Sequence, residues 1–172
     1  SLLIYPSLSS LSSRVSMPVS RLFLQADLSE SIQWVWPGQD LEAVPIFNIN
    51  VECSNCGWQS DSVHLDATSE VDSGRGKHQC NLRLKCKSCG RSIVLDYVPR
   101  STGKMANKGE KQPVVSIEAR GGSVCGWTLT HCIVHVESGM DMDVELEDGE
   151  WYDFDDEAGV PLEMTGVECT VE

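Results

Sequence analysis

Two short cysteine motifs are the residues of this sequence with the clearest capacity for chemistry. Each has the form Cys-x-x-Cys-Gly; the residues are Cys53, Cys56, Cys86 and Cys89, with 29 residues between the two pairs. A two-residue spacer lets both sulfurs of a pair face one ion, and four thiolates at roughly 2.3 Å select zinc over harder cations. We therefore predict one structural Zn²⁺ per chain, bound by these four cysteines. Such a site is closed and leaves no open position for a substrate.

Paired cysteines can instead form a redox dithiol or a disulfide. A redox pair usually lies at a helix N-terminus in a βαβ unit, where the helix dipole lowers the thiol pKa. Here both pairs follow alternating, strand-like segments, residues 47–53 and 82–86. These surroundings favour zinc, and their similarity indicates that the two halves of the site are related by approximate symmetry.

The positions of the other soft donors argue against a second metal site. Cys80 lies six residues before Cys86, roughly 20 Å along an extended strand, so we expect it to be a buried small hydrophobe. A further group could suit Cu(I): Cys125, His131, Cys132, His135, Met140 and Met142. The β-branched run over residues 131–136 predicts a strand, which would separate the two histidines by roughly 13 Å. A helix there would reverse this conclusion by bringing them together.

The charge distribution limits the classes of partner. The net charge is −13, yet ten of the 13 Lys and Arg lie within residues 75–111; after Arg120 there are 14 acidic residues and no basic ones. Phosphate neutralisation dominates nucleic-acid affinity, and the basic segment contains only Tyr97 as an aromatic, so we expect no nucleic-acid binding. The glycines of Gly74-Arg75-Gly76 precede no helical pattern, which favours a tight hairpin turn over a phosphate-binding loop.

Length and composition suit one domain in a reducing compartment. We predict a single zinc-binding β domain over residues 21–172; residues 1–20 are serine-rich and are expected to be disordered or non-native upstream sequence, with Met17 as an alternative start. No apolar run is long enough to span a bilayer, and eight cysteines without a secretory signal favour the cytoplasm. The nucleus is an alternative, and the composition of residues 1–16 gives organelle targeting weak support.

Alternation of apolar and polar residues predicts an all-β fold of antiparallel, hairpin-rich sheets around the Zn(Cys)4 site, with few short helical turns. The expected strands cover residues 22–28, 47–53, 58–65, 77–86, 91–98, 113–119, 131–136 and 160–171. Residues 30–45 are expected to be mostly loop, and Gly121-Gly122 to break the pattern. Residues 141–157 predict strand–turn–strand with Asp148-Gly149 at the turn and acids on the solvent face.

Several of these segments together resemble a known family. They are Cys53–Gly57, Gly74–Gly76, Lys85–Cys89 and Trp151–Asp155, and they look like the eukaryotic CXXC-motif-containing zinc-binding proteins, an uncharacterised family, over about residues 21–172. The resemblance implies an all-β zinc protein of cytosolic type with no established catalytic activity. A link to copper handling is a hypothesis for such proteins.

We therefore predict a non-enzymatic zinc-binding protein, with no catalytic residues, that binds another protein as a monomer. The alternative is a thiol-dependent oxidoreductase resembling methionine sulfoxide reductases; copper handling is a further one. The nucleophile of the oxidoreductase would be Cys125, Cys132 or Cys169, activated by His131 or His135. A depressed thiol pKa would favour that enzyme, because the thiolate is the reactive form.

Overall fold

The computed structural model describes residues 17–42, 46–106 and 108–172, and these residues form antiparallel strands without a helix. The first seven strands are β1 (Val19–Leu28), β2 (Ile32–Trp36), β3 (Ile46–Cys53), β4 (Val63–Asp66), β5 (Val71–Asp72), β6 (Gln79–Cys80) and β7 (Leu82–Lys85). The other seven are β8 (Ser92–Tyr97), β9 (Gln112–Arg120), β10 (Gly122–Thr128), β11 (His131–Val136), β12 (Asp141–Glu145), β13 (Trp151–Asp155) and β14 (Val160–Val171). The predicted all-β, antiparallel class is confirmed.

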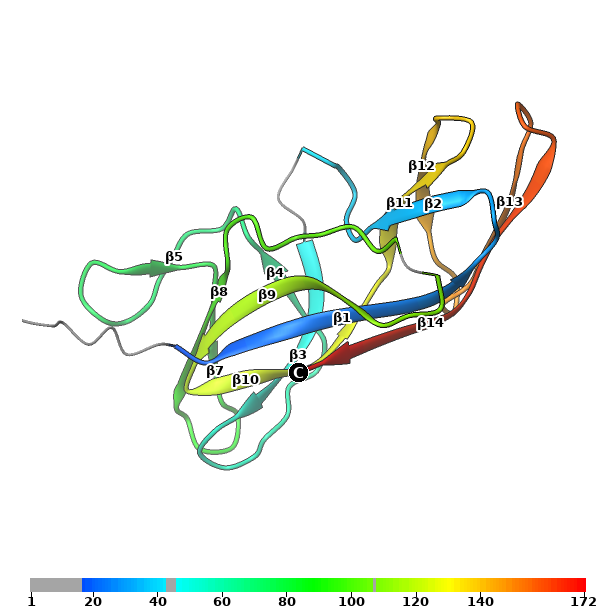
Figure 1. Cartoon of the computed structure of the whole chain (residues 1–172). Coiled ribbons are helices and arrows are strands. Elements are labelled where there is room, and N and C mark those ends of the chain that lie inside the picture. Colours follow the sequence, from blue (N-terminus) through cyan, green and yellow to red (C-terminus); the bar gives the residue numbers. More distant parts are fainter. Residues whose placement is uncertain (1–16, 43–45, 107) are drawn as a thin grey trace, which may run out of the picture.

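The strands form one large sheet and three small ones. The six-stranded sheet has the order β13-β14-β1-β9-β8-β7; the others are β10-β3-β4, β12-β11-β2 and β5-β6. Figure 1 shows β5, β7 and the loops after β3 and β7 at one end of the molecule, with β12 and β13 at the other. No described helix is long and apolar enough to cross a bilayer.

A continuous core joins the large sheet to the sheet of β3. Leu22, Leu24 and Ala26 alternate along β1 and are fully buried, as the sequence pattern predicts. Trp127 of β10 donates its indole N–H to two carbonyls, those of Phe23 at 3.2 Å and Thr170 at 3.0 Å. This side chain therefore holds β10 against β1 and β14.

Two strands, β2 and β10, were not expected from the sequence pattern. Within residues 30–45, β2 pairs with β11, and fully buried Ile32 and Val35 belong to the core. Beyond Gly121, β10 pairs with β3 along most of its length, with a bulge between Val124 and Gly126. The other described residues of 30–42 are loop and β9 ends just before Gly121, as predicted, but the sequence pattern did not predict β2 or β10, because the strand partner of each lies far away in the sequence and supplies its hydrogen bonds.

The predicted strand over residues 77–86 is divided into β6 and β7, which lie in different sheets. Asn81 causes the break. Its side-chain oxygen accepts the N–H of Tyr97 at 2.8 Å, and its side-chain nitrogen donates to the carbonyls of Ala67 at 3.2 Å and Ser69 at 3.0 Å. Its own backbone N–H donates to Asp96 Oδ1 at 3.1 Å. These bonds replace the regular ladder at this position, although Cys80 is buried as predicted.

Residues 141–157 contain the two predicted strands and the turn at Asp148-Gly149, where Glu147 and Glu150 form a bridge. The strands nevertheless join different sheets, since β12 pairs with β11 and β13 with β14. Asp155 is also fully buried, where we expected acids to face solvent. Its Oδ1 accepts the N–H groups of Glu157 at 3.0 Å and Ala158 at 3.1 Å and thereby closes the turn into β14.

The partner predicted for residues 47–53 is shorter than expected. In place of a strand over residues 58–65, β4 pairs with the first half of β3, and Gln59 forms a single bridge with Glu52.

At the N-terminal side, β1 begins at Val19, so residues 19–20 belong to the fold and the predicted boundary is slightly late. The prediction for residues 1–16 lies outside the described residues.

Candidate metal centre

The structure brings the four predicted cysteines together at one point. The sulfurs of Cys53 and Cys89 are 3.7 Å apart, those of Cys56 and Cys86 are 3.5 Å apart, and all four lie within 4.8 Å of one another. Four ligands at about 2.3 Å from a tetrahedral zinc have sulfurs about 3.8 Å apart. The arrangement therefore has the size of a Zn(Cys)4 site. Among the described residues, it is the only group of three or more Cys, His, Asp or Glu close enough to hold a metal.

The two halves of the site have matching backbone geometry, as expected from the sequence. In the first half, the N–H of Cys53 donates to the carbonyl of Trp58 at 2.8 Å and that of Gly57 donates to Cys53 at 2.9 Å. In the second, Cys86 donates to Arg91 at 2.8 Å and Gly90 donates to Cys86 at 2.9 Å. Both glycines have φ of 75°, a left-handed conformation that favours glycine.

The cysteine cluster lies between two sheets. Cys53 is the last residue of β3, the middle strand of its sheet, whereas Cys86 directly follows β7, an edge strand of the large sheet. Both are buried, while Cys56 and Cys89 are exposed. The N–H of Ser54 also donates to the carbonyl of Gly121 at 3.1 Å, so the first half of the site rests on the turn between β9 and β10. A bound metal would connect β7 to β3 covalently.

Backbone N–H groups favour the thiolate form of the exposed cysteines. The N–H of Arg91 and the side chain of Asn55 lower the pKa of Cys89 to about 6, and the N–H of Trp58 lowers the pKa of Cys56. Burial raises the pKa of Cys86 to about 11. A cation provides the counter-charge that a buried thiolate needs. These N–H donors could not be predicted from the sequence, because their position depends on the fold of each turn.

The four cysteines outside the cluster have raised thiol pKa values. Burial raises the thiol pKa of Cys80, of Cys169 and of Cys132, the last to about 12. Cys125 is exposed, yet partial burial and the nearby Glu52 carboxylate also raise its pKa. The oxidoreductase alternative needs the opposite shift.

The two candidate bases of that alternative face carboxylates. Residues 131–136 form β11, as predicted, and His131 and His135 lie on the face opposite Cys132. His131 Nε2 is 3.9 Å from Glu145, and His135 Nδ1 is 2.5 Å from Asp141 while its ring stacks on Trp34 with centroids 4.6 Å apart. The structure therefore gives both histidines local partners on β12 and β2.

The fold and the clustered thiols together define an all-β protein of the zinc–thiolate class. The chain belongs to the family described as CXXC motif containing zinc binding protein, eukaryotic, whose sequence model matches residues 21–172. The resemblance noted from the sequence is thus confirmed.

Curated relatives cover nearly the same length. A UPF0587 protein of Dictyostelium discoideum is 31% identical over 155 residues, covering 87% of this chain and 94% of that protein. A UPF0587 protein of Saccharomyces cerevisiae is 25% identical over 175 residues, covering 87% and 96% respectively.

Solved structures share the fold. The crystal structure of C1orf123 matches with a TM-score of 0.79 at 23% identity, over 90% of this chain and 99% of that one. A hypothetical protein from Plasmodium falciparum matches with a TM-score of 0.77 at 19% identity, over 91% and 100% of the two chains.

Proposed function

We propose that this protein is a non-enzymatic, zinc-stabilised module that binds another protein. One zinc ion per chain would be held by Cys53, Cys56, Cys86 and Cys89, and its role would be structural. The observation that carries this proposal is the cluster of four sulfurs between β3 and β7, all within 4.8 Å of one another, with Cys53 and Cys89 3.7 Å apart and Cys56 and Cys86 3.5 Å apart. Four thiolates fill a tetrahedral zinc, so the ion has no open position at which to activate a substrate.

The exposed edge of the large sheet supports a protein partner. Strand β13 is the last strand of the sheet, and no described strand pairs with its outer edge. Tyr152 and Phe154 are two residues apart on one face of β13, and their exposed fractions are 61% and 48%. Exposed aromatic side chains on an edge strand that has no described strand partner on its outer side suit the addition of an extended strand from a partner, which would compete with Asp153 Oδ1 for the N–H of Phe154.

The charge around β13 indicates the chemistry of that partner. Residues 121–172 contain 14 acidic residues and no Lys or Arg. Asp153 lies between the two exposed aromatics on β13, and Glu150 immediately precedes the strand. We therefore propose a basic, extended segment of another protein as the ligand. Thiols must stay reduced to bind metal, so the same proposal places the protein in a reducing compartment such as the cytoplasm.

Selection of peptides tests the proposed partner chemistry. A displayed library of random peptides is selected on the zinc-loaded protein, and the enriched peptides are expected to be rich in Lys and Arg. The double variant Tyr152→Ser/Phe154→Ser should weaken their binding about tenfold or more, because buried aromatic contacts dominate such interfaces. Ile46→Ser is the matched control, since Ile46 is a 54% exposed apolar residue on a different sheet.

The outcome is decisive in both directions. Enriched peptides without basic character, or equal loss of binding in Ile46→Ser, would contradict a role for β13. Metal analysis of the same preparation is expected to give one zinc and no copper per chain; two ions, or bound copper, would contradict the structural-zinc part of the proposal.

A further inference from the structure

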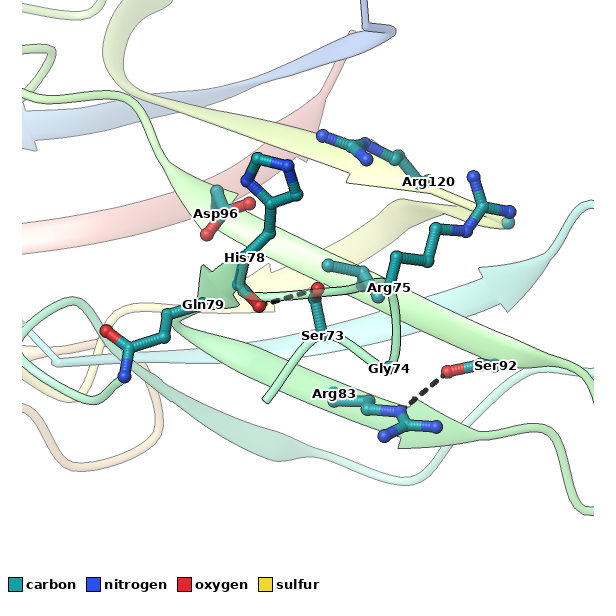
Figure 2. Close-up of a pocket in the computed structure, with 11 residues that line it drawn as sticks. Ser73, Gly74, Arg75, His78, Gln79, Arg83, Ser92, Asp96 and Arg120 are labelled. Atoms are coloured by element: carbon teal, nitrogen blue, oxygen red, sulfur yellow. Dashed lines mark hydrogen bonds between the residues drawn. The ribbon is translucent and has the colours of Figure 1, made fainter. Parts of the chain in front are cut away.

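A pocket lined by three arginines lies outside the cysteine cluster. It has a volume of about 140 Å³, and Arg75, Arg83 and Arg120 contribute to its wall together with His78, Ser92 and Asp96. Arg75 belongs to the loop between β5 and β6, Arg83 to the edge strand β7, and Arg120 is the last residue of β9. Figure 2 shows these side chains around the pocket. The sequence revealed a basic segment, but Arg120 lies outside it and only the fold brings the three together.

The positive charge of the pocket is not neutralised by its surroundings. None of the three arginines forms an ion pair with a described residue. Among the described residues, Asp96 is the only carboxylate in the pocket wall, and its Oδ1 already accepts the backbone N–H of Asn81 at 3.1 Å. Arg120 Nε also contacts Met17 Sδ at 2.6 Å, which adds no negative charge. Because the chain as a whole carries a charge of −13, three guanidinium groups without an ion pair to a described residue in one depression are unexpected without a ligand.

Hydrogen bonds fix the wall of the pocket before any ligand binds. Arg83 Nε donates to Ser92 Oγ at 3.0 Å, and its Nη1 donates to the carbonyl of Asp72 at 3.4 Å. Ser73 is buried and its Oγ donates to the carbonyl of His78 at 2.7 Å (Figure 2). These bonds hold the loop of Arg75 over β7, which lowers the ordering cost of binding.

Gly74 shows how closely the loop approaches Arg83. Its φ is +76°, and a Cβ at this position would lie 2.7 Å from Nη2 of Arg83. A side chain would therefore displace the guanidinium from the pocket wall. The Gly74-Arg75-Gly76 segment lies in the turn of the β5–β6 hairpin, as predicted. Its first glycine lets the loop contact Arg83, while Arg75 of the same segment lines the pocket.

We propose that this pocket binds the phosphate group of a small molecule. Guanidinium groups present planar pairs of N–H donors that match the oxygens of a phosphate, and three of them can complement a dianion. A pocket of about 140 Å³ has room for one phosphate and a few further atoms. A nucleic acid would bring many phosphates close to the 26 carboxylates of the chain, so a single phosphate group fits the charge distribution better.

Titration of the zinc-loaded full chain tests this site. Inorganic phosphate and glycerol 3-phosphate are the probes, and binding is followed by NMR shifts of the arginine side chains and by calorimetry. We expect saturable binding at millimolar concentrations, with shifts at Arg75, Arg83 and Arg120. Equal affinity for both probes would identify free phosphate as the ligand, whereas tighter binding of the ester would identify a phosphate monoester.

Arg75→Ala is the informative variant, because Arg75 makes no hydrogen bond or ion pair with a described residue and its removal should leave folding intact. Affinity is expected to fall about tenfold or more through the loss of charge-assisted bonds. Lys77→Ala removes the same charge from the same loop without altering the pocket wall and should retain affinity.

Three results would overturn the proposal. They are the absence of saturable binding, an equal loss of affinity in Lys77→Ala, and tighter binding of a short single-stranded RNA than of either small probe. Zinc content and melting temperature of both variants are measured in parallel, so that misfolding cannot imitate a lost site. The titration does not depend on β13, so its failure leaves the proposed protein-binding function unaffected.

Discussion

Replacing Cys86 by serine is expected to remove the metal and to lower the free energy of unfolding by about 4 kcal/mol or more. Cys86 is buried at the end of β7 and is the cysteine through which a metal would join that edge strand to the sheet of β3. Serine leaves three thiols and a poor fourth ligand, so the tetrahedral site is no longer complete.

The magnitude follows from the loop that the metal closes. The segment between Cys56 and Cys86 contains 29 residues, and a cross-link over a loop of that length removes chain entropy worth about 4 kcal/mol from the unfolded state. This is a large part of the 5–15 kcal/mol that stabilises a typical domain. For a domain of this size it corresponds to a fall in melting temperature of about 8–16 °C.

Thermal unfolding followed by circular dichroism, together with metal analysis of the same sample, provides the measurement. Cys125→Ser is the matched control, because Cys125 is exposed and lies outside the cluster; it should change stability by less than about 0.5 kcal/mol. Full zinc content in Cys86→Ser, or a melting temperature equal to that of the control, would refute the assigned ligand set.

Three other perturbations test individual parts of the structure. Asn81→Ala should cost about 2–3 kcal/mol in urea unfolding, because it removes three hydrogen bonds to backbone groups; an unchanged midpoint would contradict that role. The N–H of Ala158 holds the pKa of Asp155 below its usual value. The carboxylate therefore stabilises the folded state fully at pH values above the ordinary pKa of an aspartate, and this stabilisation is lost as the pH falls through the lowered pKa. The melting temperature of Asp155→Asn should therefore differ from the parent most at neutral pH and approach it below about pH 4, unlike exposed Asp156→Asn. Iodoacetamide should modify Cys125 slowly at neutral pH and faster only above the usual thiol pKa of about 8.5, with Glu52→Gln accelerating the reaction; rapid neutral modification in the parent would favour the oxidoreductase.

The sequence by itself determined the features that depend on local spacing. Alternation along residues 22–28 and 160–171 predicted strands because successive side chains of an extended chain point to opposite faces. The two Cys-x-x-Cys-Gly motifs predicted a joint site because each spacer allows two sulfurs to face one point, and the structure clusters all four. The turn at Asp148-Gly149 followed from residues that tolerate its backbone conformation.

Only the tertiary structure decided which segments pair. The hydrogen bonds of Asn81 reach residues 12 to 16 positions away, and they divide a segment whose alternation alone predicts one strand. The strands on either side of Asp148-Gly149 enter different sheets, and Arg120 meets Arg75 and Arg83 at one pocket. Local spacing fixes the conformation of a segment, but the partner of a strand and the neighbours of a side chain are set by contacts between distant segments, whose free energies depend on the packing of the whole chain.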